Sequence, residues 1–176
     1  MDTWKLERLQ GAIREIPDFP KPGIRFKDLT PVLGHGELFR DAVQCFLEAA
    51  APLQPEIVAG IDARGFLFGS IVAYELGVGF VPVRKKGKLP FRCRSASYQL
   101  EYGEATVEIH EDAFKPGQRV ILIDDLLATG GTAAAAGRLI TELGANLLEV
   151  QFLIELTQLG GATHLAGIPH RSFLQF

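Results

Sequence analysis

The first third of the chain carries two helical patterns of apolar residues. Near the N-terminus, four aliphatic side chains recur at steps of three and four residues: Leu6, Leu9, Ile13 and Ile16. This spacing predicts an amphipathic helix that Pro17 ends. Segment 17–23 contains three prolines and is predicted to be a stiff extended loop, because proline fixes its own φ and biases the preceding residue away from helix. A second helix is predicted from about Glu37 to Ala50, where apolar residues line one face.

The remainder of the chain alternates between strand and helix patterns. In a first unit, apolar runs at 57–61 and 78–83 enclose a turn and a helical segment. In a second unit, the runs are 120–123 and a strand near 149–154, separated by a Gly/Thr loop and an alanine-rich helix from about 132 to 143. Short continuous β-branched runs are typical of strands buried on both faces. We therefore predict an α/β fold with a mostly parallel, twisted sheet flanked by helices.

A polar region separates the two units. Residues 105–109 alternate as a half-exposed strand does, whereas 89–102 show no regular pattern and are predicted to form a flap. The last segment, 159–176, is rich in Gly and Pro, and the sequence leaves open whether it packs against the core. No repeat or linker divides the chain, so one domain over 1–176 is expected from its length and its 47% hydrophobic content.

Charge and composition exclude several classes of partner. The formal net charge of -3 and the pI of about 5.8 leave no overall positive field to hold a nucleic acid. No run approaches the roughly 20 apolar residues that span a bilayer, and acids near the N-terminus replace the apolar core of a signal peptide, so we expect no membrane partner and a cytoplasmic location. Cys45 and Cys93 are too few for a disulfide framework and too isolated for a zinc site.

Segment 119–132 combines a buried strand, two acids and a loop of small residues. Asp124 and Asp125 stand at the carboxyl end of the predicted strand, where open α/β sheets bind ligands. The loop after them contains two threonines and two glycines, which are Thr129, Gly130, Gly131 and Thr132. Glycines let backbone N–H groups approach an anion, the hydroxyls add donors, and the following helix points the positive end of its dipole at the loop. This pattern predicts a phosphate site.

The two acids restrict what the ligand can be. They would repel a bare phosphate, so the ligand must be anionic at one end and rich in donors at the other. Ribose 5-phosphate meets both conditions, because its 2- and 3-hydroxyls donate to ionised carboxylates. A nucleoside-triphosphate loop needs Lys and Ser/Thr after the glycines, a dinucleotide fold needs G-x-G-x-x-G, and neither is present. An Asp-Asp pair alone is more often a solvated turn that caps a helix, so it is the surrounding strand, loop and helix that favour a ligand site.

Segment 120–132 resembles the ribose-phosphate signature of the type I phosphoribosyltransferases in its adenine-specific form, Asp-Asp-Leu-Leu-Ala-Thr-Gly-Gly-Thr. Four further segments resemble the same family in its usual order: 17–28, 65–69, 87–90 and 97–103. The resemblance implies the type I phosphoribosyltransferase fold. It also implies an N-terminal helix and base-binding hood over about 1–34, and a basic loop and flexible catalytic flap over about 84–104.

The resemblance further implies an activity. Adenine-specific members transfer the 5-phosphoribosyl group from 5-phosphoribosyl 1-pyrophosphate to adenine, giving AMP and pyrophosphate in purine salvage. Mg²⁺ is the expected cofactor, bridged through the sugar donor with no protein ligand directly assigned, and a homodimer is the expected assembly. Asp124 and Asp125 are expected to hold the ribose and to favour positive charge on it, and Glu101 of the flap to exchange a proton with the purine imidazole nitrogen.

The resemblance assigns the remaining site residues by position. The 5-phosphate is assigned to Ala128, Thr129, Gly130, Gly131 and Thr132. The pyrophosphate is assigned to Asp62, Ala63, Arg64, Arg84, Lys85 and Lys88, partly across a dimer interface. Adenine is assigned to main-chain atoms of Arg25 and Lys27, with Phe26 and Leu127 on the two faces of the ring.

Plainer alternatives stand beside these assignments. Arg64 alone could form a surface salt bridge, the basic run 84–88 a solvated face, and Phe26 a core contact. Ala63 replaces a serine common in the family and Lys27 replaces an arginine, and both changes leave backbone contacts intact. Two other functions also stay open. One is a phosphoribosyltransferase for another base, such as a 6-oxopurine or orotate, and the other is a non-catalytic sensor of the sugar pyrophosphate.

Overall fold

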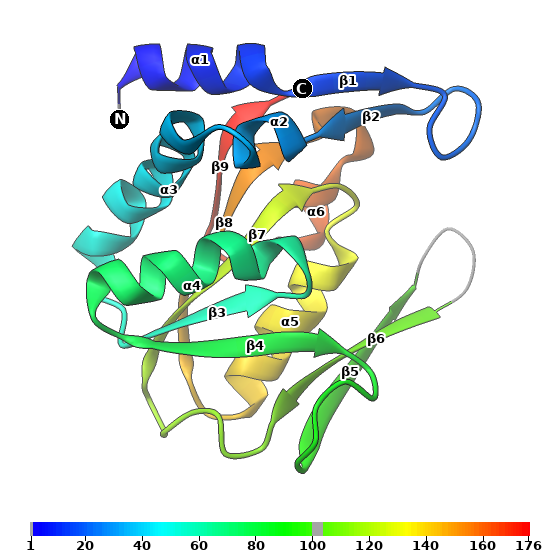
Figure 1. Cartoon of the computed structure of the whole chain (residues 1–176). Helices are drawn as coiled ribbons and strands as arrows, with labels where there is room; N and C mark the ends of the chain where they lie inside the picture. The colour runs from blue at the N-terminus through cyan, green and yellow to red at the C-terminus, as the bar shows by residue number, and fades with distance from the viewer. Residues whose placement is uncertain (1, 100–103) are drawn as a thin grey trace.

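A seven-stranded sheet runs through the part of the chain that the computed structural model describes, residues 2–99 and 104–176 (Figure 1). Its strand order is β5-β6-β4-β3-β7-β8-β9. The parallel strands are β3 (Ile57–Ile61), β4 (Gly79–Lys85), β7 (Arg119–Leu127), β8 (Asn146–Glu155) and β9 (His170–Gln175). The antiparallel edge consists of β5 (Cys93–Gln99) and β6 (Glu104–His110). The predicted α/β fold with a mostly parallel sheet is confirmed.

Helices cover both faces of this sheet because its central strands are apolar on both faces. Along β7, Val120 and Leu122 pack toward α5 (Gly131–Glu142), whereas Ile121 and Ile123 belong to the cluster on the opposite face. That face is covered by α3 (Gly36–Ala50), α4 (Arg64–Leu76) and, beyond α3, α1 (Thr3–Ala12) (Figure 1). Shorter elements fill the connections: α2 (Thr30–Leu33), η1 (Ala51–Leu53), η2 (Thr157–Leu159) and α6 (Gly161–His164).

The N-terminal helix is shorter than its hydrophobic pattern predicts. It ends at Ala12, and β1 (Arg14–Pro17) pairs with β2 (Arg25–Asp28) as an antiparallel hairpin. The prediction of helix through Ile16 is therefore wrong. Pro17 biases Ile16 toward extended backbone, and the Glu15 carboxylate lies 2.7 Å from Lys27 Nζ across the hairpin. This ion pair and the hairpin ladder replace the last helical turn.

The polar flap region is more regular than expected. Residues 93–99 form β5, paired with β6 over its whole length, so the prediction of an irregular segment is wrong there. The pattern was weak because only Ala96 is fully buried in this strand. The C-terminal segment also packs against the core. Strand β9 extends the sheet beside β8, and Leu165 and Leu174 are buried. Among the described residues, no helix is long and apolar enough to cross a bilayer.

Candidate active site

The carboxyl ends of β3, β4 and β7 meet at a cavity of about 430 Å³. Parallel strands place their carboxyl ends at one edge of a sheet, and ligands of α/β folds bind there. Seven predicted site residues line this cavity: Asp62, Ala63, Arg64, Lys85, Asp124, Asp125 and Thr132. The structure therefore brings together the acids, the start of the phosphate loop and the predicted pyrophosphate turn.

Asp124 and Asp125 lie within β7, which continues past the predicted strand to Leu127. Asp125 is 4% exposed and accepts a hydrogen bond from Arg64 Nε, while its own backbone N–H donates to Asp124 Oδ1 at 2.9 Å. Burial, and repulsion from the Asp125 carboxylate, raise the pKa of Asp124 well above its usual range. A ligand that brings hydroxyl donors or positive charge to this pair would relieve that repulsion.

The phosphate loop is held in place by close backbone packing. Gly130 has φ +83°, and a Cβ there would lie 2.3 Å from the Gly161 carbonyl oxygen, so only glycine fits. A second, smaller cavity of about 70 Å³ is lined by loop residues 128–130 together with Asp124. The N-terminus of α5 opens onto this loop, which directs free N–H groups and the positive end of the helix dipole at it. The loop geometry suits an anion.

The predicted pyrophosphate turn joins β3 to α4. The peptide bond between Asp62 and Ala63 is cis, and Arg64 is the first residue of the helix. Arg84 connects this turn to the basic loop, because its Nε lies 3.4 Å from Asp62 Oδ2 and its Nη1 donates to the Lys88 carbonyl at 3.0 Å. Arg64 does form a salt bridge, as in the plainer alternative, but its partner Asp125 is buried and Arg64 itself lines the cavity.

The hood residues do not line the cavity at the acids. The side chains of Arg25 and Lys27 both pair with Glu15, and their main-chain contact with adenine stays a prediction. Phe26 is half-buried and packs edge-on against Phe19, with ring centroids 5.3 Å apart. The hood hairpin, formed by β1 and β2, and the flap hairpin, formed by β5 and β6, project from the same side of the molecule (Figure 1).

Leu126 is a cavity residue that sequence reasoning missed. It is half-buried and lines both cavities beside the acids. Leu127, predicted to cover one face of adenine, is 1% exposed and lines the smaller cavity beside the phosphate loop, so its contact with adenine stays a prediction. Leu126 could have been found from the alternation of side chains along a strand, because β7 extends to Leu127 and consecutive side chains on it point to opposite faces. Tyr98 was also missed, and its hydroxyl accepts a 2.9 Å hydrogen bond from Thr132.

Comparison with known proteins identifies the family. The phosphoribosyl transferase domain family matches residues 39–158. The adenine phosphoribosyltransferase of Bordetella avium is 51% identical over 178 residues, which cover 100% of this chain and 98% of that protein. This chain belongs to the adenine phosphoribosyltransferase family. The resemblance predicted from its motifs is confirmed.

Solved structures of the family share the fold. The adenine phosphoribosyltransferase of Rhodothermus marinus superposes with a TM-score of 0.93 at 51% identity, covering 99% of this chain and 100% of that one. The Saccharomyces cerevisiae protein, solved with adenine and an imino-altritol bisphosphate, gives a TM-score of 0.93 at 44% identity, covering 98% of this chain and 100% of that one. Glu101, the predicted proton-transfer residue of the flap, lies outside the described residues.

Proposed function

We propose that this chain transfers the 5-phosphoribosyl group from 5-phosphoribosyl 1-pyrophosphate to adenine, giving AMP and pyrophosphate. One observation carries the proposal. The acid pair, Asp124 and Asp125, lies between two features that suit anions. On one side is the loop 128–132, and on the other is the turn 62–64, which contains Arg64. The donor has the same order of groups, with a phosphate, a ribose and a pyrophosphate. The choice of adenine rests on membership of the family and on the yeast relative, which was solved with adenine.

The donor fits these groups in one orientation. Its 5-phosphate would accept hydrogen bonds from the loop 128–132 at the start of α5. Its ribose hydroxyls would donate to Asp124 and Asp125, and its pyrophosphate would face Arg64 and the basic loop. Leu126 and the main chain of the hood would then enclose the base at the open side of the acids.

The acid pair would favour the transition state. As the bond from the anomeric carbon to the pyrophosphate oxygen breaks and the bond to the purine nitrogen forms, positive charge develops on the ribose. Asp124 is poised for this charge, because burial and its neighbour Asp125 raise its pKa and disfavour its ionised form in the free protein. Positive charge on the ligand lowers that cost only during reaction, which is how binding energy accelerates chemistry. Glu101 stays our prediction for the group that takes the purine proton.

Mg²⁺ would be held chiefly by the donor itself. In the described ranges 2–99 and 104–176, no group of three or more His, Cys, Asp or Glu side chains is arranged to bind a metal ion. The cavity does supply the carboxylates of Asp62, Asp124 and Asp125, and Mg²⁺ is commonly bound through one or two carboxylates plus substrate phosphates. When bound, the ion neutralises charge on the leaving pyrophosphate. Arg64 would contribute further neutralisation from the protein.

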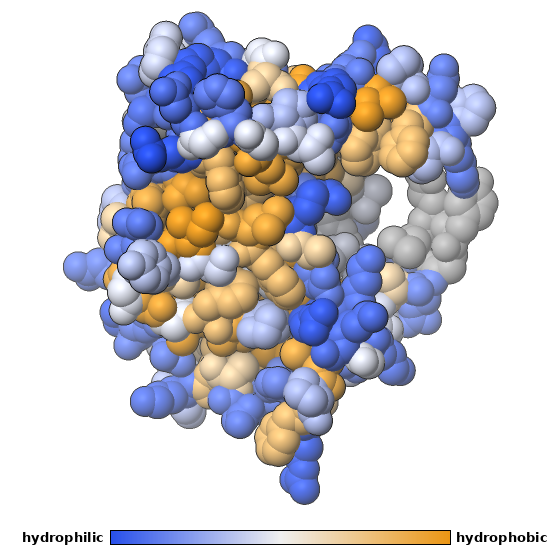
Figure 2. All heavy atoms as spheres, in the orientation of Figure 1, coloured by the Kyte–Doolittle hydropathy of each residue, from blue (hydrophilic) through white to orange (hydrophobic). Residues whose placement is uncertain are grey.

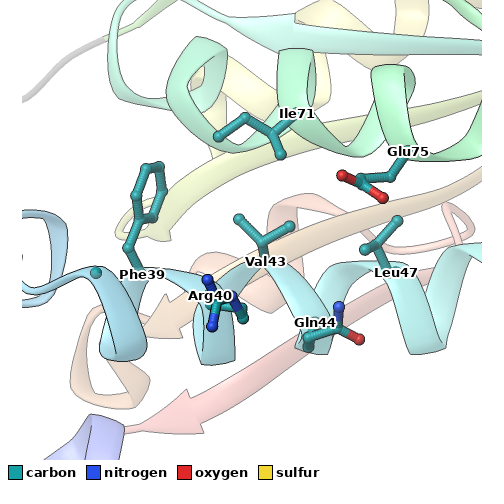
Figure 3. A pocket seen from close by; sticks show the side chains of 8 residues that line it. Phe39, Arg40, Val43, Gln44, Leu47, Ile71 and Glu75 are labelled. Carbon is teal, nitrogen blue, oxygen red and sulfur yellow. The ribbon is translucent and has the colours of Figure 1, made fainter.

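We also propose a homodimer that buries the outer face of α3 and α4. A groove of about 250 Å³ there is lined by Phe39, Arg40, Val43 and Leu47 of α3 and by Ile71 and Glu75 of α4 (Figure 3). Apolar side chains gather over these helices in Figure 2, and Tyr74, the residue before Glu75 in α4, is 82% exposed. Arg40 and Glu75 carry opposite charges, so two copies related by a two-fold axis could pair each with the other.

The dimer is tested by light scattering on purified protein. We expect the wild type to have twice the chain mass of 19.2 kDa and Ile71→Asp to be monomeric. A monomeric wild type would contradict the proposal.

We place the protein in the cytoplasm, where its two free cysteines would stay reduced.

The activity is tested by pyrophosphate release. Purified protein is given the sugar donor, adenine and Mg²⁺, beside Glu101→Ala and the nearby flap control Glu104→Ala. We expect release that needs adenine and Mg²⁺, is strongly slowed in Glu101→Ala, and is unchanged in Glu104→Ala. Binding of the donor without its consumption would contradict the enzyme and favour the non-catalytic sensor.

A further inference from the structure

Glu108 is a buried acid in the middle of the flap hairpin. It lies on β6, where its side chain is 8% exposed, and its register partners are Arg84 on β4 and Ser95 on β5. Burying a carboxylate is costly unless strong hydrogen bonds compensate. The burial of Glu108 between β5 and β4, the strand that leads into the basic loop, therefore needs a structural reason.

The carboxylate of Glu108 joins two segments of the site. Its Oε2 accepts a hydrogen bond from the Gly87 backbone N–H at 2.9 Å, and its Oε1 accepts one from the Ser95 hydroxyl at 3.2 Å. Both donors are neutral, so each bond gains strength from the charge of the acceptor alone. Gly87 has φ +79° and forms the tip of the basic loop. Glu108 thus fixes the loop tip against the flap strand.

Further contacts connect the loop tip to the pyrophosphate turn. Lys86 N–H donates to the Thr106 carbonyl of β6 at 3.1 Å, next to the Glu108 contact. Arg84 joins the Lys88 carbonyl to Asp62. Lys85 lines the cavity at the acids. A continuous set of contacts therefore runs from the flap strand through Glu108 and the basic loop to the turn that holds Arg64.

We propose that Glu108 is a positioning residue for the pyrophosphate half of the donor site. It holds the turn 85–88 so that the lysines of that turn and the arginine of the neighbouring turn face one anion together. It also ties this turn to β5, so that the flap hairpin and the pyrophosphate site are positioned as a unit. The inference rests on the proposed function, because it takes the basic loop to bind the pyrophosphate.

The test compares two ligands on the full chain by calorimetry, inorganic pyrophosphate with Mg²⁺ and AMP. Glu108→Met keeps the length of the side chain and removes both acceptors. We expect it to weaken pyrophosphate binding and raise KM for the donor about tenfold, mainly because the basic loop loses the charge-assisted hydrogen bond at the Gly87 N–H. AMP carries no pyrophosphate, so its affinity should stay within about twofold of the wild type, whereas general damage to the fold would weaken both ligands.

Three further variants complete the test. Glu108→Gln should restore pyrophosphate binding, because its carbonyl can accept from Gly87 and its amide can donate to the Ser95 hydroxyl. Ser95→Ala removes one of the two bonds and should give a smaller loss in the same direction, which decides the matter if Glu108→Met does not fold. Glu111→Met is the control, because that acid is exposed on the same hairpin and pairs with Arg94 at 3.5 Å.

The outcomes separate this role from the proposed function. Pyrophosphate affinity in Glu108→Met equal to that of the wild type would overturn the role, as would an equal loss of pyrophosphate and AMP binding. A wild type that binds neither the donor nor pyrophosphate would overturn the proposed function and this role with it.

Discussion

Replacing Gly161 by alanine should displace the phosphate loop without altering any group expected to contact a ligand. Gly161 begins α6, and a Cβ there would lie 2.2 Å from the Ala128 carbonyl oxygen and 2.9 Å from Leu127 Cδ1. Real Cβ atoms essentially never approach closer than 3.0 Å, so the loop and α6 must separate by close to an ångström. Leu127 ends β7 and Ala128 is the first residue of the phosphate loop, so the strain falls on the loop.

The size of the effect follows from this displacement. A shift of about 1 Å in a positioned group costs up to roughly 10²-fold in rate, so we expect kcat/KM for the donor to fall between about 10-fold and 100-fold. Overpacking of this kind also lowers the free energy of unfolding by about 1–3 kcal/mol. The assay is initial-rate kinetics with adenine and donor, together with AMP affinity by calorimetry and a thermal melt of the same samples.

The neighbouring Gly160 supplies a matched control. Its φ is +63° and no atom lies within 4 Å of the position that a Cβ would take, so Gly160→Ala strains the backbone by about 1–2 kcal/mol without pushing on the loop. We expect a lower melting temperature with AMP affinity within about twofold of the wild type. Folded Gly161→Ala that binds AMP as the wild type does would refute the reasoning, and so would an equal loss of AMP binding in both variants.

Three other substitutions test separate parts of the site. Burial and Asp125 raise the pKa of Asp124, so ionising this side chain lowers the stability of the folded protein as the pH rises above about 4. Asp124→Asn removes that cost and should melt about 3 °C higher than the wild type at pH 8 for each kcal/mol relieved. The difference should vanish near pH 4, and the variant should lose activity. An unchanged melting temperature at pH 8 would contradict this sign. Leu126→Ala should raise KM for adenine about tenfold, whereas Leu127→Ala should lower the free energy of unfolding by about 2–5 kcal/mol, as kinetics and denaturant titration can measure. Arg64→Lys should raise KM for the donor about tenfold, because lysine lacks the planar fork that contacts Asp125 and an anion together; an unchanged KM would remove Arg64 from the pyrophosphate site.

The sheet could be predicted from sequence because its central strands are buried on both faces. Their uninterrupted apolar runs, such as 57–61 and 120–123, can satisfy their burial only inside a parallel sheet with helices on each side. Elements that depend on distant partners were not predictable in the same way. Residues 93–99 form a strand because β6 pairs with them, and Arg14 to Pro17 form one because β2 does.

The site was predictable to the extent that it is local. The acids and the phosphate loop follow one strand in direct succession, so their order in the sequence is their order in space. The pairing of Arg64 with Asp125, 61 positions apart, depends on β3 and β7 being neighbours. The motif alone could not separate Leu126 from Leu127: β7 extends past the acids to Leu127, so the two leucines point to opposite faces and Leu126 is the more exposed.

We propose that this site joins adenine, and no other base, to the sugar donor. The most direct measurement supplies adenine, hypoxanthine, guanine and orotate together in equal amounts with the donor and Mg²⁺, and identifies the nucleotides formed by mass spectrometry. We predict AMP as the product, formed in equal amount to the pyrophosphate released, and no product when Mg²⁺ is chelated. Formation of another nucleotide in preference to AMP, or of none at all, would contradict the account.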